Sequence, residues 1–172
     1  MKVKFIKLVV SLLLVGSYFF LPKYDSHLLY PFSHANVFHL MANILCLWML
    51  RCKMHLPETY LIAVLCSLLP SFSLYDGIAG GGFTSEEPTY GFSGILFAMV
   101  GISWGKIHRF RDMIQRNKWF LVIPAFIPHI NFLIHIYCLL LGYLYGFLLS
   151  SSPFSTQRLN LGQIINKVCA KK

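Results

Sequence analysis

The sequence predicts an all-α membrane protein, a bundle of six transmembrane helices with both termini in the cytoplasm. Hydrophobic residues make up 56% of the 172 residues, charged residues only 12%, and the mean hydropathy is +0.63. Soluble domains contain about 45–50% apolar and about 25% charged residues. Six apolar segments follow one another without a repeat or a linker, so we expect a single transmembrane domain over residues 1–172.

The first three apolar segments cover residues 8–21, 37–50 and 59–74. Lysines precede the first segment, a pattern that also fits a signal peptide. No small-residue cleavage site follows it, so we expect a retained helix. Two basic residues close the second segment. Pro57 precedes the third, and proline is favoured in the first turn of a helix.

A glycine-rich loop over 76–88 leads to the last three segments, at residues 90–107, 119–128 and 132–149. A basic stretch over 106–118 separates the first two of these. Several segments are shorter than the roughly 20 apolar residues of a full membrane span. The segment 119–128 is the shortest, and we expect a short, tilted or partly re-entrant helix there.

The positions of the basic residues support this number of spans. With the N-terminus inside, the inner segments hold all of the 15 lysines and arginines except Lys23. Cytoplasmic loops of membrane proteins are enriched in these residues. The net charge of +9 would suit nucleic acid only if the basic residues gathered on one face, whereas here they lie in clusters between apolar segments. We therefore expect no nucleic-acid partner.

The five cysteines form neither a Cys-x-x-Cys pair nor a metal-ligand spacing. They are typical of small hydrophobic residues rather than of a disulfide framework. We accordingly expect neither a metal nor a cofactor. The cysteines are Cys46, Cys52, Cys66, Cys138 and Cys169.

Polar side chains on three of the expected helices lie at a similar depth, near the outer face. His34, His39 and Asn43 lie toward the outer end of the second helix. Ser93 lies in the first turn of the fourth helix, and His135 lies about one turn into the sixth. Polar groups at membrane depth are costly and usually face a bundle interior or a wet cavity. Their convergence predicts a functional site.

Small residues are spaced so that the fourth and sixth helices can pack closely. Ala98 and three glycines form a stripe on the fourth helix, and His135, Cys138 and two glycines share a face of the sixth. Such stripes let membrane helices approach each other, so that Ser93 and His135 can reach hydrogen-bond distance. The glycines are Gly94, Gly101 and Gly105 on the fourth helix and Gly142 and Gly146 on the sixth.

A serine and a histidine at that distance predict nucleophilic catalysis. A serine hydroxyl becomes an effective nucleophile when an adjacent base takes its proton. The oxyanion that follows needs preorganised donors, which His39, Asn43 and the backbone N–H of Ser93 would supply. No carboxylate lies near His135 in these segments, so we expect a dyad rather than a triad.

These residues resemble the rhomboid family of intramembrane serine proteases, in its minimal six-helix form. The family's pattern of two histidines five apart and an asparagine four further on is matched by His34, His39 and Asn43. Its Gly-x-Ser-Gly motif is matched by Gly91-Phe92-Ser93-Gly94. Its His-x-x-Gly-x-x-x-Gly motif starts at His135, with Cys138 in place of the first glycine. The resemblance covers essentially the whole chain.

The resemblance implies an endopeptidase that cuts peptide bonds in or near the transmembrane helices of substrate proteins, within the lipid bilayer and without a cofactor. It implies that Phe97 packs on the base and that His34, Gly91 and Gly94 support the site. We expect a multi-pass protein of a bacterial plasma (inner) membrane. The oligomeric state stays open.

Two other functions stay open as well. A catalytically silent relative would bind transmembrane helices without cutting them. A haem or metal protein could use histidines as ligands, but it gives no role to the Gly-x-Ser-Gly motif. His34 and Asn43 could also have purely structural roles. The histidines available to a metal are His34, His39, His129 and His135.

Overall fold

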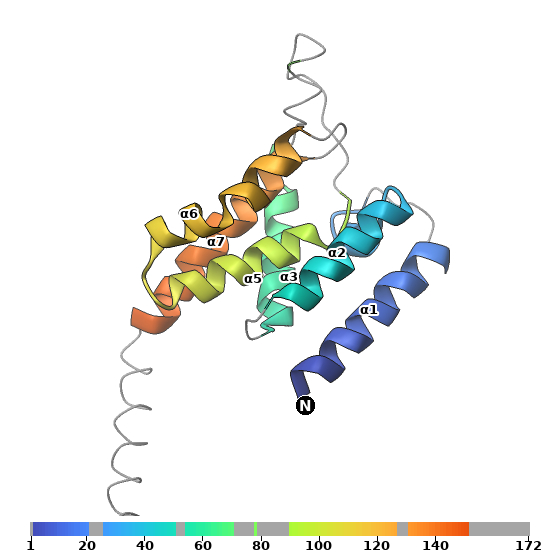
Figure 1. Cartoon of the computed structure of the whole chain (residues 1–172), viewed down its shortest axis with the longest axis horizontal. Helices are drawn as coiled ribbons and strands as arrows, with labels where there is room; N and C mark the ends of the chain where they lie inside the picture. Colours follow the sequence, from blue (N-terminus) through green and yellow to red (C-terminus); the bar gives the residue numbers. More distant parts are fainter. Residues whose placement is uncertain are drawn as a thin grey trace, which may run out of the picture.

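The expected apolar segments form helices, and the described part of the chain contains six α-helices, two short 3-10 helices and no strand (Figure 1). This computed structural model describes residues 2–20, 26–50, 54–70, 78, 90–126 and 131–151. The glycine-rich loop apart from Ile78, His129 and the C-terminal tail lie outside these ranges. The prediction of an all-helical fold is confirmed.

Helix α1 (Lys2–Phe20) packs against α2 (Val37–Met49) at one edge of the bundle (Figure 1). Lys7 is buried between them, and its ammonium group donates to the carbonyls of Trp48 and Leu50 at the end of α2. A basic side chain there satisfies carbonyls that have no partner within the helix. The lysine thus fastens the start of α1 to the end of α2.

Three helices form the centre of the bundle: α3 (Leu56–Ser67), α5 (Ser93–Gly105) and α7 (Phe132–Ser151). Helix α5 is buried along almost its whole length and packs most extensively against α7, with α3 touching both. An apolar helix that is buried on all sides belongs in the core of a bundle. This position matters because α5 begins with Ser93.

Helix α6 (Phe110–Val122) begins well before the predicted start at residue 119 and includes most of the basic stretch. Its charged side chains are exposed, whereas Met113 is fully buried and Phe120, seven residues later, is partly buried. That spacing gives an amphipathic helix, which the apolar segment alone did not reveal. A 3-10 turn, Ile123–Phe126, continues it.

Two of the described helices are long and apolar enough to cross a membrane, over Val3–Phe20 and Phe132–Ser151. Helices α2, α3 and α5 are apolar but shorter. The full set of six spans therefore stays a prediction. Many large apolar side chains of α1 point outward, among them Phe5, Leu12 and Phe19, as expected of a surface that faces lipid.

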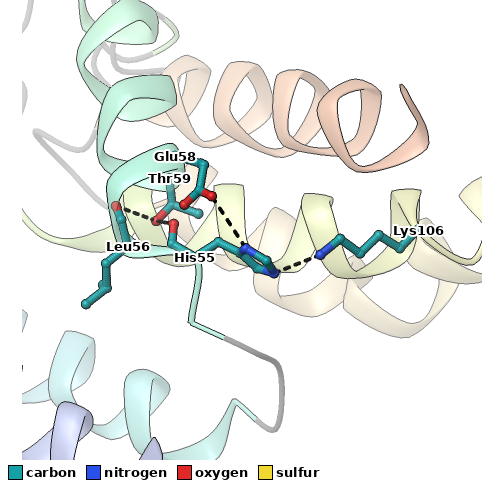
Figure 2. A network of polar contacts seen from close by, with 5 residues as sticks. All are labelled: His55, Leu56, Glu58, Thr59 and Lys106. Atoms are coloured by element: carbon teal, nitrogen blue, oxygen red, sulfur yellow. Dashed lines mark hydrogen bonds and ion pairs between the residues drawn. The ribbon is translucent and has the colours of Figure 1, made fainter. Parts of the chain in front are cut away.

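Polar contacts join the helices at the end of the bundle away from Ser93. Figure 2 shows Lys106, just after α5, reaching across to the start of α3, where its Nζ lies 2.7 Å from Nε2 of His55. The other ring nitrogen of His55 lies 3.8 Å from a Glu58 carboxylate oxygen. After the same end of α5, His108 contacts Ser150 of α7 at 2.6 Å. Helices α3 and α5 thus run in opposite directions, whereas α5 and α7 run in the same direction, since their starts meet at Ser93 and His135.

Candidate active site

The chain turns sharply into α5 just before Ser93. Gly91 has a φ of +101°, a backbone conformation that residues with a side chain rarely adopt. Phe92 caps the helix without a side-chain hydrogen bond, and Ser93 is the first helical residue. The first N–H groups of a helix have no partner within it. Ser93, which is half-buried, therefore lies where the helix directs N–H groups that have no partner within it.

His135 meets this serine from the first turn of α7. Its Nε2 lies 2.8 Å from Oγ of Ser93. The imidazole is buried, and it stacks on the ring of Phe97 with the centroids 4.5 Å apart and the planes 19° apart. Phe120 of α6 stacks on the same phenylalanine ring, also at 4.5 Å. Three helices thus hold the histidine ring in one plane beside the serine hydroxyl.

His39 and Asn43 lie against the turn that precedes Ser93. A Cβ on Gly91 would lie 2.7 Å from Nε2 of His39 and 3.2 Å from Nδ2 of Asn43, so both side chains touch the glycine backbone. The amide of Asn43 is buried and donates one N–H to the carbonyl of His39 at 3.0 Å. An amide nitrogen carries two such donors. One donor of Asn43 therefore lies close to the turn without being used by this bond.

His34 lies ahead of α2, outside the membrane-spanning helices, and supports the same turn. Its Nε2 accepts a hydrogen bond from the backbone N–H of Phe92 at 3.4 Å, and its ring packs edge-on against His39. Burial, followed by the proximity of His39, lowers the pKa of His34 to about 4, while the backbone of Phe32 acts in the opposite direction. A neutral ring is required here, because a protonated Nε2 cannot accept a hydrogen bond.

The small-residue stripes of α5 and α7 lie face to face. A Cβ on Gly142 would lie 2.5 Å from the carbonyl oxygen of Ala98, and one on Gly101 would lie 2.7 Å from the backbone nitrogen of Tyr143. Gly105 and Gly146 likewise face the backbone of the opposite helix. The two helices are in direct backbone contact, which only residues without bulky side chains allow. This contact sets the spacing of Ser93 and His135.

A family model for the rhomboid domain matches residues 23–152. The chain belongs to the rhomboid family. No match to it was found among curated proteins or solved structures. Rhomboid proteins are integral membrane proteins, and the family generally consists of intramembrane serine proteases, with some inactive members. The matched range includes every residue of the site described above.

Tyr30 is a residue of this rhomboid site that the sequence patterns did not single out. Its carbonyl accepts from the N–H of Gly91 at 3.0 Å, and its buried hydroxyl donates to the carbonyl of Ala63 at 3.0 Å. That hydroxyl also lies 2.7 Å from the position of a Cβ on Gly94. The 3-10 turn Tyr30–Phe32 therefore supports both glycines that flank Ser93.

Asn36 is a second residue that was missed, although its position carries a signal. Its side chain accepts from the N–H of His39 at 2.8 Å and caps α2. Asparagine directly before an apolar helical segment is a typical N-cap. The cap fixes where α2 begins, and therefore where His39 and Asn43 lie relative to the rhomboid serine turn.

The histidines do not come together as a metal site in the described ranges. No group of three or more His, Cys, Asp or Glu residues that could hold a metal ion occurs there. His34 packs against His39, and His135 contacts Ser93. His129 lies outside the described residues. The described geometry of this rhomboid thus pairs a histidine with a serine.

Proposed function

We propose that this rhomboid is an active intramembrane serine endopeptidase that cleaves peptide bonds in or near the transmembrane helices of its substrates. The observation that carries the proposal is the 2.8 Å approach of Ser93 Oγ to His135 Nε2 at the start of a buried helix. A nucleophile and a base within about 2.6–3.2 Å are the signature of nucleophilic catalysis. The rhomboid family match supports the same reaction.

The proposed reaction begins with the transfer of a proton. The Ser93 hydroxyl donates to the unprotonated Nε2 of His135, and that nitrogen takes the proton as the oxygen attacks the carbonyl carbon of the substrate. The imidazolium then gives the proton to the leaving amine, as a general acid. Stacking on Phe97 keeps Nε2 directed at the hydroxyl during both transfers. Water repeats the sequence to release the acyl group.

The oxyanion of the tetrahedral intermediate would lie between α2 and the start of α5. The backbone N–H of Ser93, the second amide N–H of Asn43 and the ring of His39 are the proposed donors. Gly91 supports this assignment, because the imidazole and the amide touch it two residues before the nucleophile. Donors fixed in advance stabilise charge that develops only in the transition state, and losing one costs about 3–4 kcal/mol.

The substrate must present an extended backbone to Ser93, because a carbonyl inside a helix is occupied by its own hydrogen bond. We infer that the site faces the outer side of the membrane, where the distribution of basic residues places the starts of α2, α5 and α7. Contacts join the starts of these three helices at the site, as a shared side of the membrane requires. Substrate helices with small or helix-weakening residues near that face would fit best.

Cleavage of a model transmembrane substrate by the purified protein in liposomes tests the proposal. Ser93→Ala and His135→Ala should each abolish the product while the protein stays folded. Ser103→Ala is a matched control, since Ser103 lies on the same helix and its hydroxyl donates to the Met99 carbonyl. Undiminished cleavage by Ser93→Ala would sink the mechanism. Substrate binding without cleavage by the unaltered protein would identify the silent relative instead.

A further inference from the structure

Two cysteines lie next to each other behind the Ser93–His135 pair. Cys66 belongs to α3, and Cys138 lies on α7, one turn after His135. Both are free thiols and both are buried, with exposed fractions of 2% and 0%. Their thiols lie close enough to interact with each other. None of the catalytic steps described above uses them.

The surroundings of Gly94 independently bring the same two helix faces together. A Cβ on Gly94 would lie 3.4 Å from Sγ of Cys138 and 3.7 Å from Cβ of Ala63. Ala63 precedes Cys66 by three residues and therefore shares its face of α3. Tyr30 lies beside the same residues, because its hydroxyl donates a hydrogen bond to the Ala63 carbonyl. Cys138, one of the two cysteines, thus lies beside the residue that directly follows the proposed nucleophile.

We infer that Cys66 and Cys138 form a reversible disulfide that switches off the neighbouring site. The S–S bond is about 2.0 Å long, much shorter than the contact distance between two sulfur atoms that are not bonded. Closing it draws α3 toward α7 and pulls on the backbone one turn from His135. The base must stay within about 2.6–3.2 Å of the hydroxyl to take its proton. The inhibitory half of the inference rests on the proposed protease function, whereas the bond itself does not.

A small uncharged peroxide is the class of oxidant that can enter a buried site in a bilayer. One cysteine sulfur attacks the O–O bond of hydrogen peroxide, which gives a sulfenic acid and one water. The second sulfur attacks the sulfenic sulfur, the S–S bond forms, and the hydroxyl leaves as a second water. The two thiols lose two electrons and two protons, and the peroxide is reduced to two waters. A dithiol reductant reverses the reaction by exchange.

The bond can be detected without measuring proteolysis. The full-length protein in liposomes is treated with hydrogen peroxide, its remaining thiols are alkylated, and the digest is analysed by mass spectrometry. We expect a linked pair of peptides that carry Cys66 and Cys138 and have lost two hydrogen atoms. The link should disappear in Cys66→Ala. It should persist in Cys46→Ser, because Cys46 is a free cysteine on a different helix, α2. Treated protein without this link overturns the inference.

Proteolysis measured on the same samples tests the inhibitory half. Peroxide should lower cleavage by the unaltered protein at least about tenfold, since a misplacement of about 1 Å can cost 10²-fold. A dithiol should restore it, and Cys66→Ala should be insensitive to peroxide. If protein that carries the disulfide cleaves at the full rate, the disulfide does not inhibit the site. If the untreated protein cleaves nothing, the protease proposal fails, while the peptide digest still decides whether the bond forms.

Discussion

At the scale of single residues, the site depends on groups that touch the turn before Ser93. The side chains of His39 and Asn43 contact Gly91, and the N–H of Gly91 donates a hydrogen bond to the carbonyl of Tyr30. The N–H of the neighbouring Phe92 donates a hydrogen bond to the ring of His34. These contacts fix the backbone from which Ser93 projects, so that small changes in them should alter catalysis more than stability.

Replacing Asn43 by alanine should remove one proposed oxyanion donor. We expect kcat to fall about 10²–10³-fold, the usual effect of losing one such donor and less than the effect of Ser93→Ala. Turnover of a transmembrane substrate in liposomes measures it. Asn117→Ala is the matched control, because the Asn117 amide makes the same bond to a carbonyl one turn back, at 2.8 Å, on α6. Equal activities of the two variants would remove Asn43 from the mechanism.

Acid should weaken the structure through His34. Its pKa of about 4 in the folded protein lies below the value of about 6.5 expected in the unfolded chain. Its contribution to stability is therefore complete above pH 6.5 and is lost as the pH falls toward about 4, because only the unfolded chain binds the proton. Thermal unfolding in detergent at pH 7.5 and pH 5 measures this loss.

A glutamine at position 34 provides the comparison, since its side-chain oxygen can accept from the Phe92 N–H but does not titrate. His34→Gln should lose less stability between pH 7.5 and pH 5 than the unaltered protein. An identical loss in both proteins would assign the acid sensitivity to other groups.

Residue chemistry explains which members of the site could be predicted. Ser93 and His135 stand out because nucleophile and base require particular side chains, and their approach to 2.8 Å follows from the small-residue stripes. Tyr30 could not be found in this way. It acts on the turn through its backbone carbonyl, which every residue possesses, and through packing that only the folded chain reveals.

At the scale of helices, the backbone contact between α5 and α7 is the feature most sensitive to substitution. In Gly101→Ala the new methyl group would meet the carbonyl oxygen of Leu139 and lie 2.7 Å from the nitrogen of Tyr143. Backbone atoms cannot move aside, so the helices must separate. We expect a loss of about 1–3 kcal/mol in the free energy of unfolding, seen as a lower thermal midpoint, together with weaker cleavage.

Gly16→Ala is the matched control for this prediction. Gly16 lies in α1, and a Cβ there would have nothing within 4 Å. Alanine favours helices over glycine by up to about 1 kcal/mol, so stability should stay the same or rise. Equal destabilisation by both substitutions would contradict the importance of the contact.

Helix boundaries were harder to predict than helix positions. The apolar segments located α2 and α5 well, because both helices are largely apolar: α5 is buried along almost its whole length, and α2 exposes large apolar side chains such as Phe38 and Met41. Helix α6 was placed too late in the sequence, because its first part is amphipathic and exposes its charges while Met113 faces inward. A search for continuous apolar segments does not detect a helix that buries only one face.

At the scale of the whole molecule, the distribution of basic residues predicts a single orientation in the membrane. A reporter fused after Lys172 should be cytoplasmic, and one inserted beside Lys23 should be outside. Lys7 and Lys106 support this, since their contacts with Leu50 and His55 lie at the end of the bundle opposite the site. An external C-terminal reporter would contradict both the orientation and the proposed position of the site.

The contact between the glycine faces of α5 and α7 also has a consequence for the lipid environment. Membrane helices respond to bilayers of different thickness by tilting. Two helices joined backbone to backbone must tilt as one body, whereas α1 is held to its neighbours through side-chain hydrogen bonds of Lys7, Ser11 and Ser17 and is freer to adjust separately. Thicker or thinner lipids should therefore change how a substrate helix reaches Ser93 while leaving the distance from Ser93 to His135 unchanged.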